Sequence, residues 1–197
     1  MKTLLSSLFC LFVFISVQSQ DILKIYGIKS GIIEYKHSGT NTGTSTLYFD
    51  NFGQKSANYM VITAQGKTQK SWVVSLSEMQ YIYDPVTRTG QKMKNPLIEG
   101  LKEIDDLEKF TEDMYTKMGF KPAGNENFLG RDCRVFKGDM GKVLTWNGLL
   151  MLMEMTVMGT TTRQEATKVD VNVPVKASLF EVPADIKFTE LPAFGFE

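Results

Sequence analysis

Apolar and polar residues alternate through the first half of the chain. In residues 31–37, Ile33 and Tyr35 fall on one face while Glu34 and Lys36 fall on the other, a pattern typical of a half-buried strand. The same period predicts further strands at residues 46–50, 59–64, 70–76 and 79–84. We interpret the small, polar residues 38–43 as the loop between the first two strands. These segments together predict a meander.

The period changes to that of a helix between residues 96 and 118. Its apolar residues recur at spacings of three and four, which predicts one amphipathic helix; they are Leu97, Leu101, Ile104, Leu107, Phe110, Met114 and Met118. Pro96 lies where a first turn tolerates proline, and Gly119 lies where a C-terminal cap favours glycine. The acidic opposite face is interpreted as a solvated surface.

Strand patterns resume after this helix, at residues 130–138 and 142–146. Asn147-Gly148 follows, and this dipeptide between two apolar runs is a strong hairpin signal. It makes the methionine-rich segment 149–158 the second arm of a hairpin, followed by a strand at 161–173 and a closing segment at 178–188. The predicted fold is mainly β with one long helix (α+β), in a mostly antiparallel sheet of about nine to eleven strands.

The methionine-rich strand raises the question of a ligand. Strict alternation would place Leu149, Met151, Met153, Met155 and Val157 on one apolar face. Methionine adapts to guests of different shape, and one helix is too narrow to cover so wide a sheet. We therefore consider a ligand lining as well as simple core packing. The candidate hydrophobic lining comprises Trp146, Leu149, Met151, Met153, Met155 and Val157, with Trp72, Leu107, Phe110 and Met114.

Copper is a weaker hypothesis for the same strand. Thioether sulfur is a soft ligand that suits Cu(I), but successive methionines on one strand face are about 7 Å apart. No histidine or cysteine lies nearby in the sequence. We expect no metal and no cofactor.

The N-terminus predicts export. Lys2 precedes an apolar run from Leu4 to Val17, and the polar residues 18–20 follow, as in a secretory signal peptide cleaved after Ser19 or Gln20. Residues 1–20 are therefore interpreted as the signal, and residues 21–197 as a single domain that is soluble in the periplasm and at most peripheral to a membrane. Removing Cys10 with the signal leaves Cys133 as the only thiol, so no intramolecular disulfide forms.

Charge and histidine content argue against nucleic-acid binding and catalysis. The 22 basic residues equal the 22 acidic residues, and no long basic block suggests a nucleic-acid partner. His37 is the only histidine, at the end of a strand, where we expect a surface role. One thiol and one imidazole do not make a usual zinc site, and Cys133 is interpreted as a buried structural residue. We therefore predict a protein that is not an enzyme.

Several of these segments together resemble the LolA-like superfamily, in an uncharacterised exported branch. The resemblance depends on SGIIEYKH, the central helix, GNENFLGRDCRVFKG, VLTWNGLLMLME and LFEVPADIKF, and its individual positions are Glu126, Gly130, Cys133, Trp146, Gly148, Phe180 and Pro183. It covers nearly all of the chain after the predicted signal. This sequence differs from the lipoprotein carrier in having only one clear long helix.

The resemblance implies a curved half-barrel with helix packed across its concave, apolar face. Members of that superfamily bind acyl chains or lipidated proteins there, so it implies an exported binding protein for a hydrophobic small molecule, a lipid or a lipoprotein acyl chain. The alternative is an envelope module with a dry core and no ligand, which binds a partner protein.

Overall fold

The computed structural model describes residues 23–95, 98 and 107–192. The predicted signal segment, residues 1–20, lies outside these residues, as does most of the first half of the predicted helix. The described elements, in chain order, are β1 (Gly31–Gly39), β2 (Asn41–Asp50), η1 (Asn51–Gly53), β3 (Lys55–Ala64), β4 (Lys67–Leu76), β5 (Met79–Asp84), β6 (Thr89–Lys94), α2 (Leu107–Lys117), β7 (Lys121–Phe128), β8 (Arg131–Gly138), β9 (Gly141–Trp146), β10 (Leu149–Val157), β11 (Thr160–Val171), η2 (Ala177–Phe180) and β12 (Lys187–Glu190).

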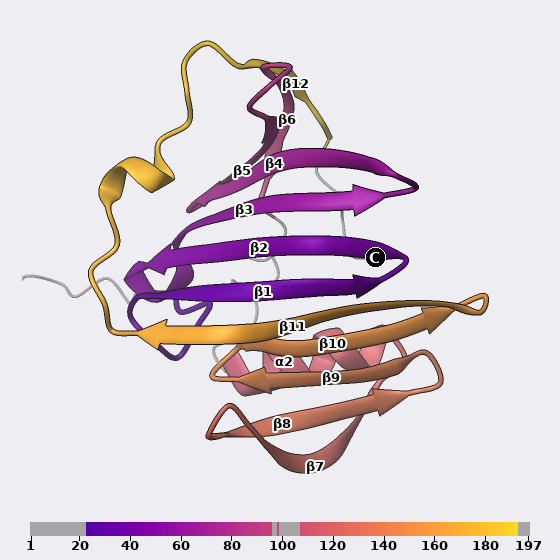
Figure 1. Ribbon diagram of the computed structural model, residues 1–197. Helices are drawn as coiled ribbons and strands as arrows, with labels where there is room; N and C mark the ends of the chain where they lie inside the picture. The colour runs from indigo at the N-terminus through magenta and orange to yellow at the C-terminus, as the bar shows by residue number, and fades with distance from the viewer. Residues whose placement is uncertain (1–22, 96–97, 99–106, 193–197) are drawn as a thin grey trace, which may run out of the picture.

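All the described strands form one curved sheet (Figure 1). Its order is β12-β6-β5-β4-β3-β2-β1-β11-β10-β9-β8-β7, so β7 and β12 are the two edges and the sheet does not close into a barrel. Neighbouring strands are antiparallel, except for the β12–β6 pair, which is parallel. The predicted mainly β fold with a half-barrel sheet is thus confirmed.

The strand pattern differs from the prediction in three places. The sheet has 12 strands rather than nine to eleven, because β6 and the exposed edge strand β7 carry no apolar alternation. The predicted loop at residues 38–43 is wrong: β1 and β2 continue through it and leave only Thr40 between them. This hairpin end is solvated on both faces, so it has no two-residue period. The closing segment forms η2 before the short strand β12.

Helix α2 confirms the C-terminal half of the predicted helix and its glycine cap. Gly119 has a φ of +87°, its amide donates to the Thr116 carbonyl at 2.9 Å, and the Phe120 amide donates to the Tyr115 carbonyl at 2.9 Å. These two bonds form a Schellman motif. The rings of Tyr115 and Phe120 also meet edge-on, with 6.2 Å between their centroids. The motif therefore ends the helix and turns the chain into β7.

Each face of the sheet is partly covered by other segments of the chain. Helix α2 lies behind β9 and β10 in Figure 1, and Tyr115 packs with Phe136 and Val143 there. On the opposite face the segment after β11 crosses the sheet, and Phe180 of η2 packs with Ala57 and Val74. The face covered by α2 is called the inner face below, and the face covered by η2 the outer face.

Candidate functional site, a cavity under helix α2

A cavity of about 240 Å³ lies between α2, the N-terminal segment and the inner face of the sheet. Its lining is mostly apolar or aromatic and consists of Ile25, Tyr26, Tyr35, Leu47, Asn58, Leu107, Phe110, Thr111, Met114, Tyr115, Gly148, Leu150 and Gln164. Ligand pockets commonly measure about 300–1,000 Å³, so this cavity is small. It suits a compact ligand or the end of a longer chain.

The amphipathic pattern of the helix explains its side of the cavity. Leu107, Phe110 and Met114 are spaced by three and four residues, and all three line the cavity. These three members of the predicted lining are therefore brought together by the structure. They remain half-buried rather than fully packed, as expected for side chains that border an open space.

The Asn147-Gly148 turn closes one end of the cavity. Both residues have positive φ, 50° and 76°, as expected for the predicted two-residue hairpin. A Cβ atom at Gly148 would lie 2.8 Å from the Ile25 carbonyl oxygen and 3.3 Å from a Leu107 methyl carbon. Glycine at this position thus lets the N-terminal segment and α2 approach the hairpin closely.

Arg134 of β8 ties α2 to the sheet. Its guanidinium donates to the Glu112 carboxylate at 2.7 Å and lies 3.9 Å from that of Glu108. It also lies over the Phe136 ring, 5.3 Å from the centroid, in cation–π geometry. Because these groups are partly solvated, the ion pair is a modest restraint rather than a strong one.

None of the described residues that line the cavity is charged. Burial raises the pKa of Tyr26 to about 12 and that of Tyr115 to about 12, and it raises the pKa of Tyr35 as well. These phenols therefore stay protonated at neutral pH. The cavity presents a neutral interior to any ligand.

Among the described residues that line the cavity, Asn58 has a buried side-chain atom without a hydrogen-bond partner. The side-chain oxygen Oδ1 of Asn58 is buried and accepts no hydrogen bond from the described part of the chain. By contrast, the Tyr35 hydroxyl donates to the Leu150 carbonyl at 2.9 Å, and the Thr111 hydroxyl donates to the Leu107 carbonyl at 2.8 Å. Asn58 was not among the predicted lining residues, which were all apolar, and the strand predicted at residues 59–64 begins one residue after it.

A β-bulge separates the methionines that strict alternation would place together. The pairing of β10 with β9 shifts register between Leu150 and Leu152, so one extra residue breaks the two-residue period. Met153 and Met155 pack with Leu150 in the aromatic cluster of α2. Met151 is instead fully buried in the main core. The prediction is therefore wrong for Met151, which does not share a face with Met153 and Met155, whereas these two do lie together.

The remaining predicted lining residues lie outside the cavity. Leu149 is fully buried in the same core as Met151, and Val157 is 48% exposed near the end of its strand. Trp146 packs against that core under the Arg131 guanidinium, which lies 4.9 Å from the centroid of its ring. The Trp72 ring lies tilted against the Tyr59 ring, with 4.9 Å between centroids.

Register explains the position of Trp72. Asn58 pairs with Val73, so these two residues share the inner face and the next residue, Trp72, points to the outer face. Sequence alternation alone could not decide which of the two faces is the inner one.

The structure confirms the predicted burial of Cys133 but not the predicted surface position of His37. His37 is half-buried rather than on the open surface: its Nε2 lies 2.8 Å from the hydroxyl of buried Ser45, and burial lowers its pKa. Cys133 is a fully buried free cysteine, as predicted, and burial raises the pKa of its thiol. The described residues include no group of three or more His, Cys, Asp or Glu side chains placed to hold a metal ion.

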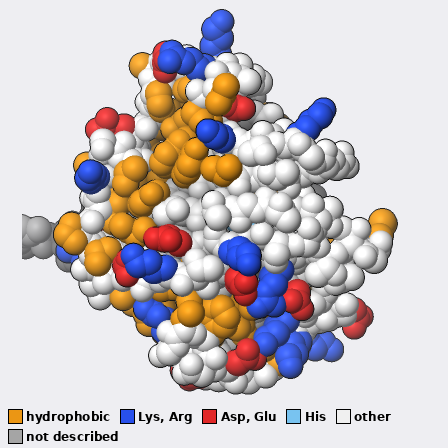
Figure 2. Space-filling model, in the orientation of Figure 1, with side chains coloured by type: hydrophobic (Ala, Val, Ile, Leu, Met, Phe, Trp, Pro, Cys, Tyr) orange, Lys and Arg blue, Asp and Glu red, His pale blue; other side chains and the backbone are white. Residues whose placement is uncertain are grey.

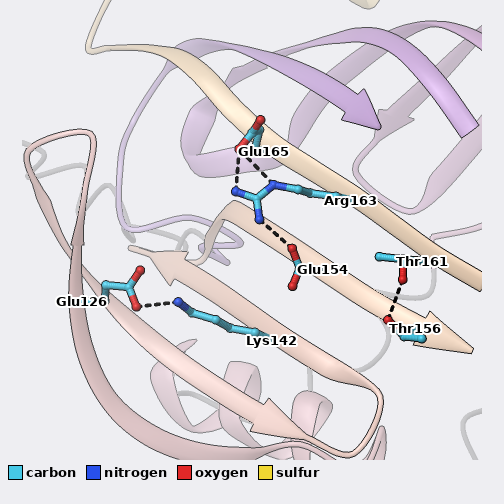
Figure 3. A network of polar contacts seen from close by, with 7 residues as sticks. All are labelled: Glu126, Lys142, Glu154, Thr156, Thr161, Arg163 and Glu165. Carbon is cyan, nitrogen blue, oxygen red and sulfur yellow. Dashed lines mark hydrogen bonds and ion pairs between the residues drawn. The ribbon is translucent and has the colours of Figure 1, made fainter. Parts of the chain in front are cut away.

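The outer face divides into an apolar part and a charged part. Figure 2 shows apolar side chains gathered at its upper left and charged side chains at its lower right. The charged part forms a cross-strand network (Figure 3), in which Arg163 binds Glu154 and Glu165 at 2.7 Å each and Lys142 binds Glu126 at 2.5 Å. Each ion pair at this level of exposure contributes little to the free energy of unfolding. The network lies on the outer face, away from the cavity.

None of the described helices is long and apolar enough to cross a membrane.

No protein-family model and no curated protein matches the chain. Among solved structures, an uncharacterised conserved protein from Thermus thermophilus aligns at 8% identity and a TM-score of 0.55, over 87% of this chain and 96% of that one. At that identity it shows a shared fold alone.

Two other solved structures align more loosely. The MucA/MucB complex of Pseudomonas aeruginosa aligns at 10% identity and a TM-score of 0.45, over 82% of this chain but only 58% of that one. A putative outer membrane lipoprotein-sorting protein domain from Vibrio parahaemolyticus aligns at 10% identity and a TM-score of 0.35, over 77% of this chain and 89% of that one. The half-barrel architecture that the LolA-like resemblance predicted is seen in the chain's own open, curved sheet.

Proposed function

We propose that this protein is an exported, non-enzymatic binding protein that holds an acyl chain or another apolar ligand in the cavity under α2. The observation that carries the proposal is the cavity itself, which has a neutral and mostly apolar lining. A cavity of this kind gains affinity by removing apolar ligand surface from water. A free lipid, or one acyl chain of a lipidated protein, fits this chemistry.

The volume limits how much of the ligand is enclosed. An apolar cavity of about 150 Å³ accommodates benzene, with six carbon atoms. By the same ratio, the 240 Å³ cavity holds about ten non-hydrogen atoms. A longer acyl chain would have only its end enclosed unless α2 moves, and the partly solvated Arg134 contacts would permit such movement.

A filled-cavity variant tests the proposal. We expect native mass spectrometry of the purified protein to show a bound lipid, and a neutral fluorescent acyl probe to bind saturably. Met114→Trp places a larger side chain in the cavity and should abolish probe binding. Met118→Trp is the matched control, because Met118 is 40% exposed near the end of the same helix. Absence of both bound lipid and saturable binding would refute the proposal.

The alternative is an envelope module that binds a partner protein. The observation that favours it is the half-buried aromatic stack on the outer face, in which Trp72 contacts Tyr48 and Tyr59. Under this alternative, Trp72→Ser would abolish capture of the partner, whereas Met114→Trp would leave it intact. The opposite pattern, loss of lipid binding with Met114→Trp alone, supports the cavity.

Export to the periplasm is supported by the N-terminal sequence. Lys2 and the apolar run after it match a secretory signal. The mass of the protein recovered from the periplasmic fraction should correspond to a chain that begins at Gln20 or Asp21. Recovery of the uncleaved chain from the cytoplasm would contradict export.

A further inference from the structure

Asn58 is a polar residue in an apolar part of the inner face. Along the sheet its direct neighbours are Leu47 on β2 and Val73 on β4, and neither side chain has a polar atom. The register therefore offers the Asn58 amide no cross-strand partner. Its side chain lines the cavity together with Leu47.

The Asn58 oxygen is a hydrogen-bond acceptor that none of the described residues uses. It is buried and has no partner in the described part of the chain. The Tyr35 and Thr111 hydroxyls each have a single proton, which each donates to a backbone carbonyl. A buried polar atom without a partner carries a desolvation cost that a bound group can remove.

The missing partner must be a donor, and it must be neutral. No Lys, Arg or His is among the described lining residues, so a ligand carboxylate would be buried without a countercharge. Burial of an unpaired carboxylate is far more costly than burial of a neutral group. An amide N–H or an alcohol O–H satisfies both conditions.

We propose that the cavity selects amphiphiles whose polar end is neutral and donates a hydrogen bond, and that the Asn58 side-chain oxygen accepts this bond. The enclosed part of such a ligand is a short chain of about ten non-hydrogen atoms, given the 240 Å³ volume. This inference rests on the proposed function and specifies its ligand class: fatty amides and fatty alcohols rather than fatty acids.

Isothermal titration calorimetry with four probes of equal chain length tests the inference. The probes are octanamide, octan-1-ol, methyl octanoate, which has no donor, and octanoate at pH 8, which is charged. We expect octanamide and octan-1-ol to bind about 10-fold more tightly than methyl octanoate, and octanoate to bind most weakly. Equal affinities for octanamide and methyl octanoate, or tightest binding of octanoate, would overturn the inference while leaving hydrophobic binding intact. If none of the probes binds, the proposed function fails as well.

Asn58→Leu identifies the acceptor. It should remove the 10-fold advantage of octanamide without weakening methyl octanoate, because only the hydrogen bond is lost. Asn58→Ala serves as a second variant if leucine disturbs folding, which thermal melting will reveal. Asn127→Leu, on the exposed edge strand β7, is the matched control and should leave all four affinities unchanged. Retention of the octanamide preference in folded Asn58→Leu or Asn58→Ala would overturn the role of Asn58.

Discussion

The β-bulge in β10 leads to a direct comparison of two neighbouring methionines. Met151 is 0% exposed in the main core, whereas Met153 is half-buried in the cluster near α2. Truncation of a fully buried methionine to alanine costs about 2–5 kcal/mol of unfolding free energy. We expect a loss of about 3 kcal/mol for Met151→Ala and about half as much for Met153→Ala, since partial exposure reduces both the transfer and the cavity contributions.

Urea denaturation followed by circular dichroism measures these losses. A chain of this size shifts in melting temperature by about 2–4 °C per kcal/mol, so Met151→Ala should lower it by about 6–12 °C and Met153→Ala by about half of that. The slope of unfolding free energy against urea must stay constant in both variants for the comparison to hold. Equal losses would refute the reasoning, because they would mean that the two side chains are equally packed and that the bulge does not separate them.

Three further predictions concern the helix, the tyrosines and the thiol. Arg134→Met should cost about 1 kcal/mol and speed hydrogen exchange of α2 amides; unchanged exchange would show that Arg134 does not hold the helix. Burial raises the pKa of Tyr115 to about 12, a two-unit shift that corresponds to roughly 3 kcal/mol of unfolding free energy. This contribution to stability should be complete below pH 10 and lost as the pH rises through 12. Urea titrations from pH 9 to 12 measure this loss, and it should shrink in Tyr115→Phe. Cys133 should react with a thiol reagent only when the protein unfolds, because the native side chain is 0% exposed; rapid native reaction would contradict its burial.

Local chemistry made some features predictable from the sequence. The Asn147-Gly148 turn needs positive φ at both positions, and these two residues tolerate it more readily than most others. The end of α2 at Gly119 follows from the same backbone requirement. Leu107, Phe110 and Met114 line the cavity as the helical spacing indicates. Each of these predictions depends on residues within a few positions of one another.

Other features depend on non-local register. The bulge at Leu150–Leu152 contains no glycine or proline that would predict it from the sequence. The one inserted residue gives Met151 different neighbours from those of Met153. Trp72 lies on the outer face because Asn58 pairs with Val73, a pairing between separate strands. The edge strand β7 is exposed along most of its length. It buries neither face, so its sequence does not alternate between apolar and polar residues and resembles that of a loop.

The position of Asn58 is informative through both its local sequence pattern and its strand register. At a core-facing position between Leu47 and Val73, an aliphatic side chain would fit the local pattern and avoid a cost of about 1–3 kcal/mol for a buried polar atom without a partner. That cost is a substantial part of a typical domain stability of about 5–15 kcal/mol. Departures from local consistency concentrate at functional sites, and this one lies on the wall of the cavity under α2. The same residue that weakens the empty protein is therefore the one best placed to distinguish a donating ligand from a hydrocarbon.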